Sequence, residues 1–364
     1  NGNHLLLSGN GAAQAYLGKI GARDRLTGPA RAKYPFVDLA SGECWTLEIG
    51  EGAAPWWIFD SARRAPRTRA RDYLPALKLL WPRRARTLAE TGITSARIYD
   101  ALLRPFLLAA LNNDPAECSA PLAGRVLREA FRGGARSCRP LYAPGGLSNA
   151  FVDPALAFIG ERGASVGFGR RLRALHFDGR QVVGLEFDAE TMDVAPGDVV
   201  VLATPPDVAA RLVPGLTTPC EFRAIANIHF LTGRASRLAP VTAVLNGATQ
   251  WIFAVPDRIC VTISDAAEWL KTPQEDLAKK VWREVATVTE LPEAIPPWRV
   301  IRERKATFAP TPEQEKRRPG TATAWRNLFV AGDWTDTGLP ATIEGAIRSG
   351  RSAARMALGM EQSA

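Results

Sequence analysis

A glycine turn near the C-terminus, at Gly332, is the segment of this chain whose residue types and spacing could most directly do chemistry. Residues 328–330 form a short apolar run that predicts a strand, and Pro340 with Thr342 predicts the start of a helix that Gly359 ends. A helix that begins beside such a turn points free N–H groups at whatever lies above the strand. Because these groups and the helix dipole favour negative charge, the pattern predicts a site for a phosphate or for an anionic, electron-rich ring.

The residues around this turn resemble a known cofactor signature. They comprise Gly332-Asp333-Trp334-Thr335, the run Pro340-Ala341-Thr342-Ile343-Glu344-Gly345-Ala346, and Ser349-Gly350. Together they resemble the C-terminal FAD signature of the flavin amine oxidase and phytoene desaturase superfamily. Within that superfamily they resemble the squalene-associated branch, the hydroxysqualene dehydroxylases of hopanoid synthesis. The alternative, an ordinary strand–turn–helix of an α/β protein, would not need the whole string.

The resemblance implies FAD as the cofactor and gives several residues a role. Asp333 would hold the ribityl chain, and the backbone of residues 342–344 would face the pyrimidine edge of the flavin. There the start of the helix would stabilise the negative charge that reduced flavin develops near N1. The backbone near Leu172 would meet the adenine. The cofactor-binding residues expected in this way are Leu172, Ala203, Thr204, Gly332, Asp333, Trp334, Pro340, Thr342, Ile343 and Glu344, and no metal site is predicted.

The beginning of the chain lacks the element with which such flavoproteins open. A strand, a G-x-G-x-x-G turn and a helix are expected there, but the chain starts at Asn1 without an initiator methionine. Residues 1–10 resemble the family segment that follows this βαβ unit and passes under the flavin ring. We therefore expect the chain to be a fragment that lacks the N-terminal dinucleotide-binding unit.

A second glycine-rich stretch, 9–14, imitates the missing fingerprint but does not satisfy it. Its third glycine is replaced by Gln14, and the apolar run before it covers only residues 5–7. We expect residues 11–20 to form an amphipathic helix that ends at Gly21. The residues expected on its buried side are Ala12, Ala15, Tyr16 and Leu17.

Length and composition indicate a two-domain protein with a large core. The chain has 364 residues with 46% hydrophobic content. It has neither an apolar run near the roughly 18 residues that span a bilayer nor a recognisable signal peptide, so a soluble or peripheral protein of the cytoplasm is expected. Five scattered cysteines without C-x-x-C spacing, at positions 44, 118, 138, 220 and 260, support neither a disulfide framework nor a zinc site.

The net charge of +9 arises largely from one cluster. Nine basic residues face only Asp72 as an acidic neighbour: Arg63, Arg64, Arg67, Arg69, Arg71, Lys78, Arg83, Arg84 and Arg86. Trp56, Trp57 and Trp81 flank the cluster, and an apolar stretch follows within residues 102–111. This combination is typical of peripheral contact with an anionic membrane through residues 56–111. A solvated basic face beside an apolar core helix explains it about equally well. The distribution of the charge argues against nucleic acid as a partner. The oligomeric state is not indicated by the sequence.

The fold class expected is α/β, with a Rossmann-like FAD-binding domain that is N-terminally truncated and a second α+β domain on a mainly antiparallel sheet. The predicted FAD domain comprises residues 1–30, 140–215 and 310–364, and the predicted substrate domain comprises 31–139 and 216–309. Strands are expected at 171–177, 181–187, 199–202 (buried and parallel), 224–230, 241–245, 251–255 and 259–263. One helix is expected at 154–162, and a second from Thr272 to about Val285. Thr272 is expected to cap the second helix through its side chain, in a capping box completed by Glu275.

The chemistry implied by the resemblance is the delivery of a hydride from reduced FAD to an allylic carbon of a long apolar isoprenoid, as hydroxide leaves. His4 is the candidate catalytic acid, because its segment should approach the flavin, although a structural histidine bonded to backbone is the favoured alternative. His176 and His229 fall within expected strands and are predicted to be structural. A carotenoid-type desaturase, an amine oxidase and a flavin-free lipid-binding fragment are the alternative functions.

Overall fold

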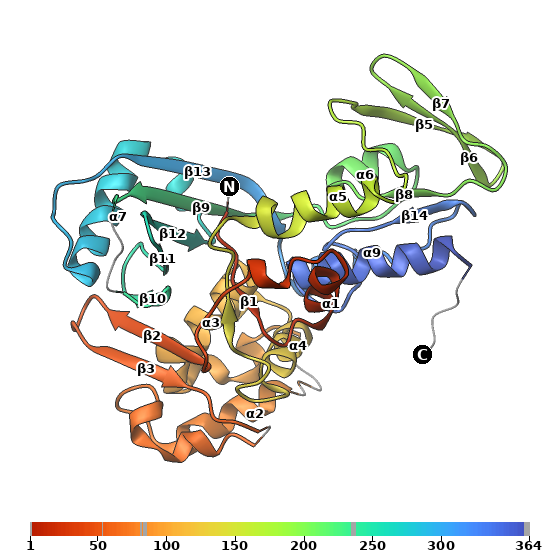
Figure 1. Ribbon diagram of the computed structural model, residues 1–364. Coiled ribbons are helices and arrows are strands. Elements are labelled where there is room, and N and C mark those ends of the chain that lie inside the picture. Colours follow the sequence, from red (N-terminus) through yellow and green to blue (C-terminus); the bar gives the residue numbers. More distant parts are fainter. Residues whose placement is uncertain (1, 53, 81, 83–85, 234–237, 360–364) are drawn as a thin grey trace.

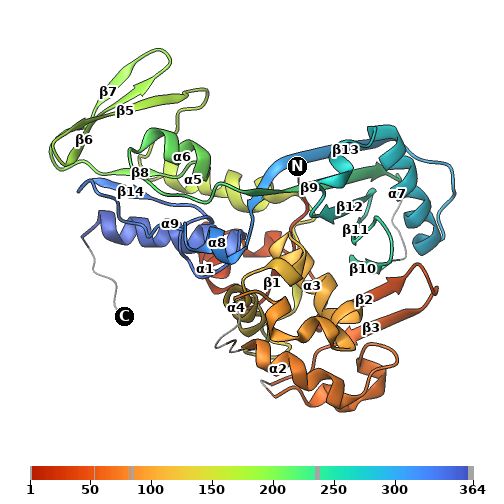
Figure 2. The same cartoon turned by 180° about the vertical axis from the view of Figure 1, so that it is seen from behind.

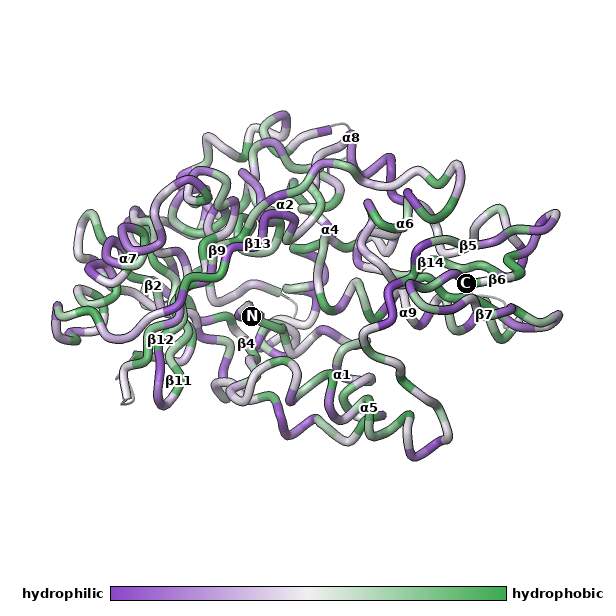
Figure 3. Tube along the Cα trace, turned by 90° about the horizontal axis from the view of Figure 1, so that it is seen from above, coloured by the Kyte–Doolittle hydropathy of each residue, from purple (hydrophilic) through white to green (hydrophobic). Residues whose placement is uncertain are grey.

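The computed structural model describes residues 2–52, 54–80, 82, 86–233 and 238–359. Two groups of elements lie side by side in Figures 1 and 2: one is built on a seven-stranded sheet, and the other holds the C-terminal helix and a short parallel strand pair. Viewed from above, in Figure 3, helix α7 and the sheet β5–β7 lie at opposite ends of the molecule. The predicted boundaries of the two domains stay a prediction.

The C-terminal group has the strand–turn–helix that the sequence predicts. Strand β14 (Leu328–Val330) pairs in parallel with β8 (Val200–Leu202), and helix α9 (Ile343–Ala357) follows the turn. The parallel strand near 199–202 is therefore confirmed, but its predicted full burial is wrong. Val199 and Val201 are 41% and 44% exposed, because β8 pairs only with β14 among the described strands.

Helix α1 (Gly11–Lys19) lies alongside α9, as Figures 1 and 2 show. Ala12 and Leu17 are buried as predicted, and Gly21 follows with a positive φ of 69°. The prediction of Ala15 on the buried side is wrong, since Ala15 is exposed and Ala13 is buried instead. The N-terminus of α1 points at the start of α9. The first residues of α1 are therefore buried, rather than one full face of it.

The large sheet has the order β13-β9-β12-β11-β10-β2-β3 and is antiparallel except between β10 and β2. Four of its strands confirm the predicted ones: β9 (Phe222–Leu231), β10 (Val241–Leu245), β11 (Trp251–Val255) and β12 (Arg258–Ser264). Three further strands were not predicted: β2 (Lys33–Asp38), β3 (Cys44–Glu48) and β13 (Trp298–Phe308). β2 and β3 come from a distant part of the sequence and extend the sheet by pairing in register with β10 and with each other.

Helix α7 (Gln274–Thr289) covers one face of this sheet, and Val281 and Trp282 pack there against Ile228 and Phe230. The predicted side-chain cap by Thr272 and Glu275 is wrong. The helix is preceded by Pro273 at the cap position without a side-chain hydrogen bond, and Glu275 instead forms an ion pair with Lys279.

Helices α2 (Leu74–Leu80), α3 (Arg104–Leu111) and α4 (Ala120–Phe131) pack together over the end of the sheet that carries β2 and β3. The other elements are β1 (Leu6–Leu7), β4 (Pro140–Leu141), α5 (Asp153–Gly160), β5 (Leu172–Asp178), β6 (Gln181–Phe187), β7 (Thr191–Asp193), α6 (Pro206–Leu212) and α8 (Pro312–Glu315). Within the described ranges, no helix combines the length and apolar character that crossing a membrane requires.

Candidate functional site

The turn after β14 is fixed by contacts that only glycine permits at position 332. The N–H of Gly332 donates to Ser349 Oγ at 2.8 Å, and its carbonyl accepts from Thr335 N at 3.1 Å. Trp334 is 2% exposed and donates from Nε1 to the carbonyl of Thr204 at 2.9 Å. A Cβ atom at position 332 would overlap the Trp334 indole, so the close approach of ring and backbone requires the glycine.

The start of α9 leaves two backbone donors available. Thr342 is the N-cap residue, and its Oγ1 accepts from the N–H of Gly345 at 3.1 Å. The next N–H, of Ala346, donates to the Thr342 carbonyl at 2.9 Å. The N–H groups of Ile343 and Glu344 have no hydrogen bond to the described residues, as expected of the first turn of a helix. These donors can bind an acceptor on a ligand, which is the use that the sequence predicts for them.

Asp333 is half-buried beside this helix start. Burial raises the pKa of its carboxyl above the ordinary value of 3.8, while the Arg318 guanidinium and the N–H of Trp334 oppose the rise. Burial of a carboxylate costs free energy unless a donor compensates it. A ligand hydroxyl that donates to Asp333 would supply that compensation.

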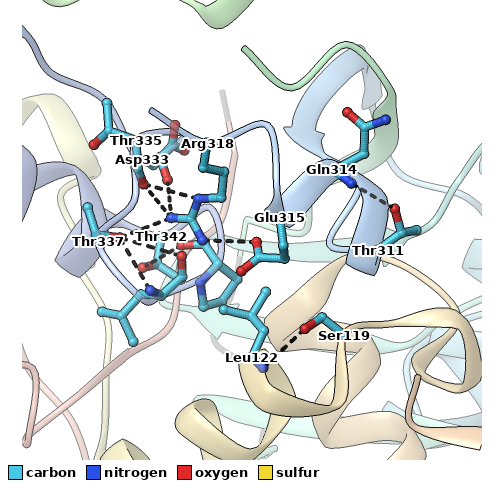
Figure 4. A network of polar contacts seen from close by, with 12 residues as sticks. Ser119, Leu122, Thr311, Gln314, Glu315, Arg318, Asp333, Thr335, Thr337 and Thr342 are labelled. Atoms are coloured by element: carbon cyan, nitrogen blue, oxygen red, sulfur yellow. Dashed lines mark hydrogen bonds and ion pairs between the residues drawn. The ribbon is translucent and has the colours of Figure 1, made fainter. Parts of the chain in front are cut away.

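Arg318 organises the loop and was not identified from the sequence. Its side chain is fully buried and donates to the carbonyls of Thr335 at 3.1 Å and Asp333 at 3.2 Å, and to Thr337 Oγ1 at 3.2 Å. Glu315 compensates its charge at 3.0 Å, as Figure 4 shows. By holding these carbonyls on one side, Arg318 fixes the conformation of the loop. The only sequence signal was one arginine in the basic run 316–318, which gives no indication of burial.

The side chain of Glu344 has a role in addition to the one that the resemblance implies for its backbone. Its buried carboxylate accepts from the N–H groups of Ala12 at 3.0 Å and Ala13 at 2.8 Å, at the N-terminus of α1. Arg348 donates to the same carboxylate at 2.9 Å and to Glu129 of α4 at 3.0 Å. The side chain of Glu344 therefore caps another helix and links three elements.

The other residues predicted to bind the cofactor lie around the same turn. Thr204 follows β8, and its hydroxyl is buried without a hydrogen-bond partner among the described residues. Leu172 begins β5 and packs on the hydrophobic cluster that contains Trp334. Ala203 is exposed, and Pro340 is buried with its carbonyl 3.3 Å from Thr342 Oγ1. The unpartnered hydroxyl, the free N–H groups of α9 and the buried Asp333 fit a cofactor with polar groups in this place.

His4 lies in a different setting from the turn. Its neighbour Asn3 contacts Thr262 Oγ1 at 3.4 Å, which places the segment on β12 of the large sheet. His4 is exposed, yet the protein around its ring displaces water and lowers its pKa below the ordinary value of 6.5. A lowered pKa favours the neutral ring near pH 7, which weakens the case for a general acid. The catalytic role of His4 stays a prediction. His176 and His229 lie in β5 and β9, where they contact Glu186 at 3.1 Å and Cys260 at 3.0 Å.

A cavity of about 760 Å³ lies between β2–β3, helices α2 to α4 and the segment 52–59. Its lining is dominated by aliphatic and aromatic side chains, among them Tyr34, Ile58, Leu102, Phe106 and Trp251. Its volume is within the range of about 300–1,000 Å³ that small-molecule sites occupy. The cavity can therefore enclose a long apolar ligand.

One end of the cavity is polar and lies toward α9. Arg125 and Glu129 of α4 line it, and Glu129 is the residue that Arg348 of α9 contacts. Gly338, in the loop before α9, lies against the Arg125 guanidinium. The cavity thus adjoins the loop that the sequence assigns to the cofactor.

Trp81, Arg83 and Arg84 of the predicted membrane segment lie outside the described residues.

The fold and this strand–turn–helix site define an FAD-dependent oxidoreductase. The chain belongs to the flavin-containing amine oxidoreductase family, whose model matches residues 1–236 and 246–358. Solved structures support the fold. An oxidoreductase from Methanosarcina mazei has a TM-score of 0.71 at 14% identity, covering 97% of this chain and 87% of that one. Cyclohexylamine oxidase from Brevibacterium oxydans has a TM-score of 0.69 at 11% identity, with coverages of 100% and 88%.

Relatives with higher identity carry one common name. The hydroxysqualene dehydroxylases of Rhodopseudomonas palustris, Sinorhizobium fredii and Zymomonas mobilis are 48%, 45% and 41% identical to this chain. Each alignment covers 98% of this chain and 86% of the relative. The expected fold class, an FAD-binding part with a second α+β part, is confirmed, as are the resemblance and the cofactor.

Proposed function

We propose that this protein is a reductive dehydroxylase that converts hydroxysqualene to squalene. The observation that carries the proposal is the apolar cavity of about 760 Å³, whose polar end lies beside the loop of the flavin signature. Three relatives named for this activity, at 41–48% identity, support it. Among the described residues that line the cavity, the charged ones are Arg125, Arg128, Glu129 and Arg132, all on or next to α4, and the rest of the lining suits a hydrocarbon chain better than an amine.

Bound reduced FAD would supply the hydride that the allylic carbon accepts as its C–O bond breaks, so the substrate is reduced and hydroxide leaves. The residues of the chain hold and shield the reactants. Thr342 and the N–H groups of Ile343 and Glu344 would bind an electron-rich ring edge, and Asp333 would accept from a hydroxyl. The apolar walls exclude water and align the isoprenoid chain.

The proton that converts hydroxide to water needs a donor. His4 is the residue that we propose for this role, and its lowered pKa means that only a minor fraction is protonated near pH 7. The variant His4→Gln tests whether His4 donates this proton. If the variant keeps full turnover, the proton comes from solvent or another group, and His4 is removed from the mechanism.

The test of the proposed function is anaerobic turnover of hydroxysqualene by the flavin-loaded protein with a chemical reductant. Squalene should accumulate in proportion to the reductant consumed, as measured by mass spectrometry. Peroxide release with an amine substrate in air, without consumption of hydroxysqualene, would instead assign the chain to amine oxidation. Oxidation of a polyene without added reductant would indicate a desaturase.

A variant that narrows the cavity connects the activity to the structure. Ala76 of α2 lines the cavity and is half-buried, so Ala76→Trp should raise KM for hydroxysqualene by about tenfold or more while the flavin spectrum stays unchanged. Ala89→Trp, at an exposed position that does not line the cavity, is the matched control. Equal KM values for both variants would mean that the substrate binds elsewhere.

A further inference from the structure

Four large apolar side chains are exposed at the rim of the cavity. Trp56 is 72% exposed, Phe59 66%, Leu74 56% and Leu77 49%. All four also line the cavity, so the apolar outer surface continues into the interior. Contiguous exposed apolar surface of this kind marks a site of interaction with a protein, a ligand or a membrane.

Local structure keeps these side chains outside. Trp56 and Phe59 lie on the short helix Trp56–Phe59 with ring centroids 6.1 Å apart, while Ile58 between them is buried. Leu74 and Leu77 lie one turn apart on one face of α2, and Leu79 is fully buried. Each element therefore presents two apolar side chains outward while it anchors itself by another.

The charge around this rim has one predominant sign. Residues 54–80 carry six cations, Arg63, Arg64, Arg67, Arg69, Arg71 and Lys78, against the two carboxylates Asp60 and Asp72. Both carboxylates already accept backbone N–H groups, from Ala62 and Arg69.

Three of the cations are available to a partner. Arg69, Arg71 and Lys78 are exposed and form no ion pair with other described residues. An apolar rim with tryptophan and with free cations beside it matches the two layers of an anionic membrane surface, the acyl boundary and the headgroups.

We propose that residues 54–80 dock on an anionic lipid bilayer, so that the mouth of the cavity opens to the acyl chains. Through this mouth the hydrocarbon substrate passes between membrane and cavity without crossing water, a consequence that rests on the proposed function. The docking itself does not rest on it, because the exposed apolar residues and the cations are sufficient.

Co-sedimentation tests the docking with the flavin-loaded protein and vesicles of phosphatidylcholine, with or without phosphatidylglycerol. Binding is expected only to the anionic vesicles and should weaken at high salt. The variant Arg69→Gln/Arg71→Gln/Lys78→Gln should bind about a hundredfold more weakly, since each cation near the surface contributes about fivefold. Trp56→Ser/Phe59→Ser should lose the quenching of tryptophan fluorescence by brominated lipids.

The net charge of +9 requires a control variant with the same loss of charge. Lys271→Gln/Arg283→Gln/Arg299→Gln removes three exposed cations around α7 and β13, on the side away from α2 in Figure 1. This control should bind like the wild type. Equal losses for both triple variants, or equal binding to neutral vesicles, would overturn the proposal.

Turnover distinguishes failure of the docking from failure of the function. With hydroxysqualene dispersed in detergent, the Arg69/Arg71/Lys78 variant should turn over like the wild type, which also shows that it folds. With hydroxysqualene in anionic vesicles it should be slower. Binding to vesicles without any dehydroxylation would leave the docking intact and reject the function. If the wild type is a dimer without lipid and the Trp56→Ser/Phe59→Ser variant is a monomer, this surface binds a second copy of the chain. That result would overturn the docking.

Discussion

Asp333 shows how a single residue can be placed for binding at a cost to the empty protein. Its pKa is raised because burial disfavours the charged form. The carboxyl group therefore contributes most to stability below its ordinary pKa of 3.8, and that contribution is lost as the pH rises through the raised value. A residue whose ionised form destabilises the fold without its ligand is typical of a functional site.

Asp333→Asn tests this interpretation. In the flavin-free protein the variant should be more stable than the wild type at about pH 7, and the difference should shrink toward about pH 4. Flavin affinity should fall by about 1.5–3 kcal/mol, the contribution of a hydrogen bond to a charged group. Thermal unfolding across pH and flavin titration measure the two effects. Asp336→Asn, at the exposed neighbouring position, should change neither; a large destabilisation by Asp333→Asn at pH 7 would make the carboxyl structural.

The residues that the sequence identified and those that it missed differ in the range of their contacts. Gly332, Thr342 and Trp334 belong to a local string whose turn and cap are determined within a few residues. Arg318 is important because of carbonyls 15 and 17 residues away, and Ala12 because of a carboxylate 332 residues away. Such contacts leave no local pattern in a single sequence.

At the level of elements, the strand–turn–helix from β14 to α9 depends on the absence of one side chain. Gly332→Ala should lower the free energy of unfolding by about 1–3 kcal/mol, because the added Cβ displaces the packed indole of Trp334. Flavin binding should weaken with it, since the same turn carries Asp333.

Gly350 provides the matched control for this prediction. It lies within α9, and a Cβ there would have open space around it. Gly350→Ala should therefore raise the free energy of unfolding by about 0.5–1 kcal/mol, the difference in helix propensity. Chemical denaturation measures both variants; equal effects would show that close packing at the turn does not decide the outcome.

Most helices and strands with a clear periodic pattern of apolar residues were predictable, and the elements that were missed have physical causes. Strands β10 and β11 match the predicted runs because their alternation and turns are local. β2 and β3 were missed because β2 joins the sheet by pairing with β10, which lies far along the chain, and β3 joins it by pairing with β2. Residue 272 resembled a helix cap, but Pro273 occupies the cap position in the structure.

At the scale of the whole molecule, one ionic network joins the flavin loop to the substrate cavity. Glu344 caps α1, Arg348 bonds to Glu344, and Glu129 on α4 bonds to Arg348 while it lines the cavity. Partly buried groups with several partners interact more strongly than exposed pairs. The network thus couples the position of α9 to the polar end of the cavity.

A double-mutant cycle measures this coupling. Glu344→Gln should cost about 1–3 kcal/mol of unfolding free energy, since it weakens the bonds to Ala12 and Ala13 and removes the charge that compensates Arg348. In combination with Arg348→Met, the two effects should be non-additive by at least about 0.5 kcal/mol. The pair Glu275 and Lys279 on α7, which is exposed, is the control and should be additive within error. Additive effects at Glu344 and Arg348 would mean that the network does not act as a unit.

The hydrogen bonds from Ala12 and Ala13 to Glu344 also determine when the site can form during synthesis. The carboxylate that caps α1 is translated 331 and 332 residues after the N–H groups that it accepts from. Until the start of α9 leaves the ribosome, α1 lacks its cap and α9 itself is missing as a packing partner. Closing so long a loop makes folding slow. Nascent chains should therefore acquire flavin only after the start of α9 has left the ribosome, whereas the large sheet, whose last strand ends at Phe308, can assemble earlier.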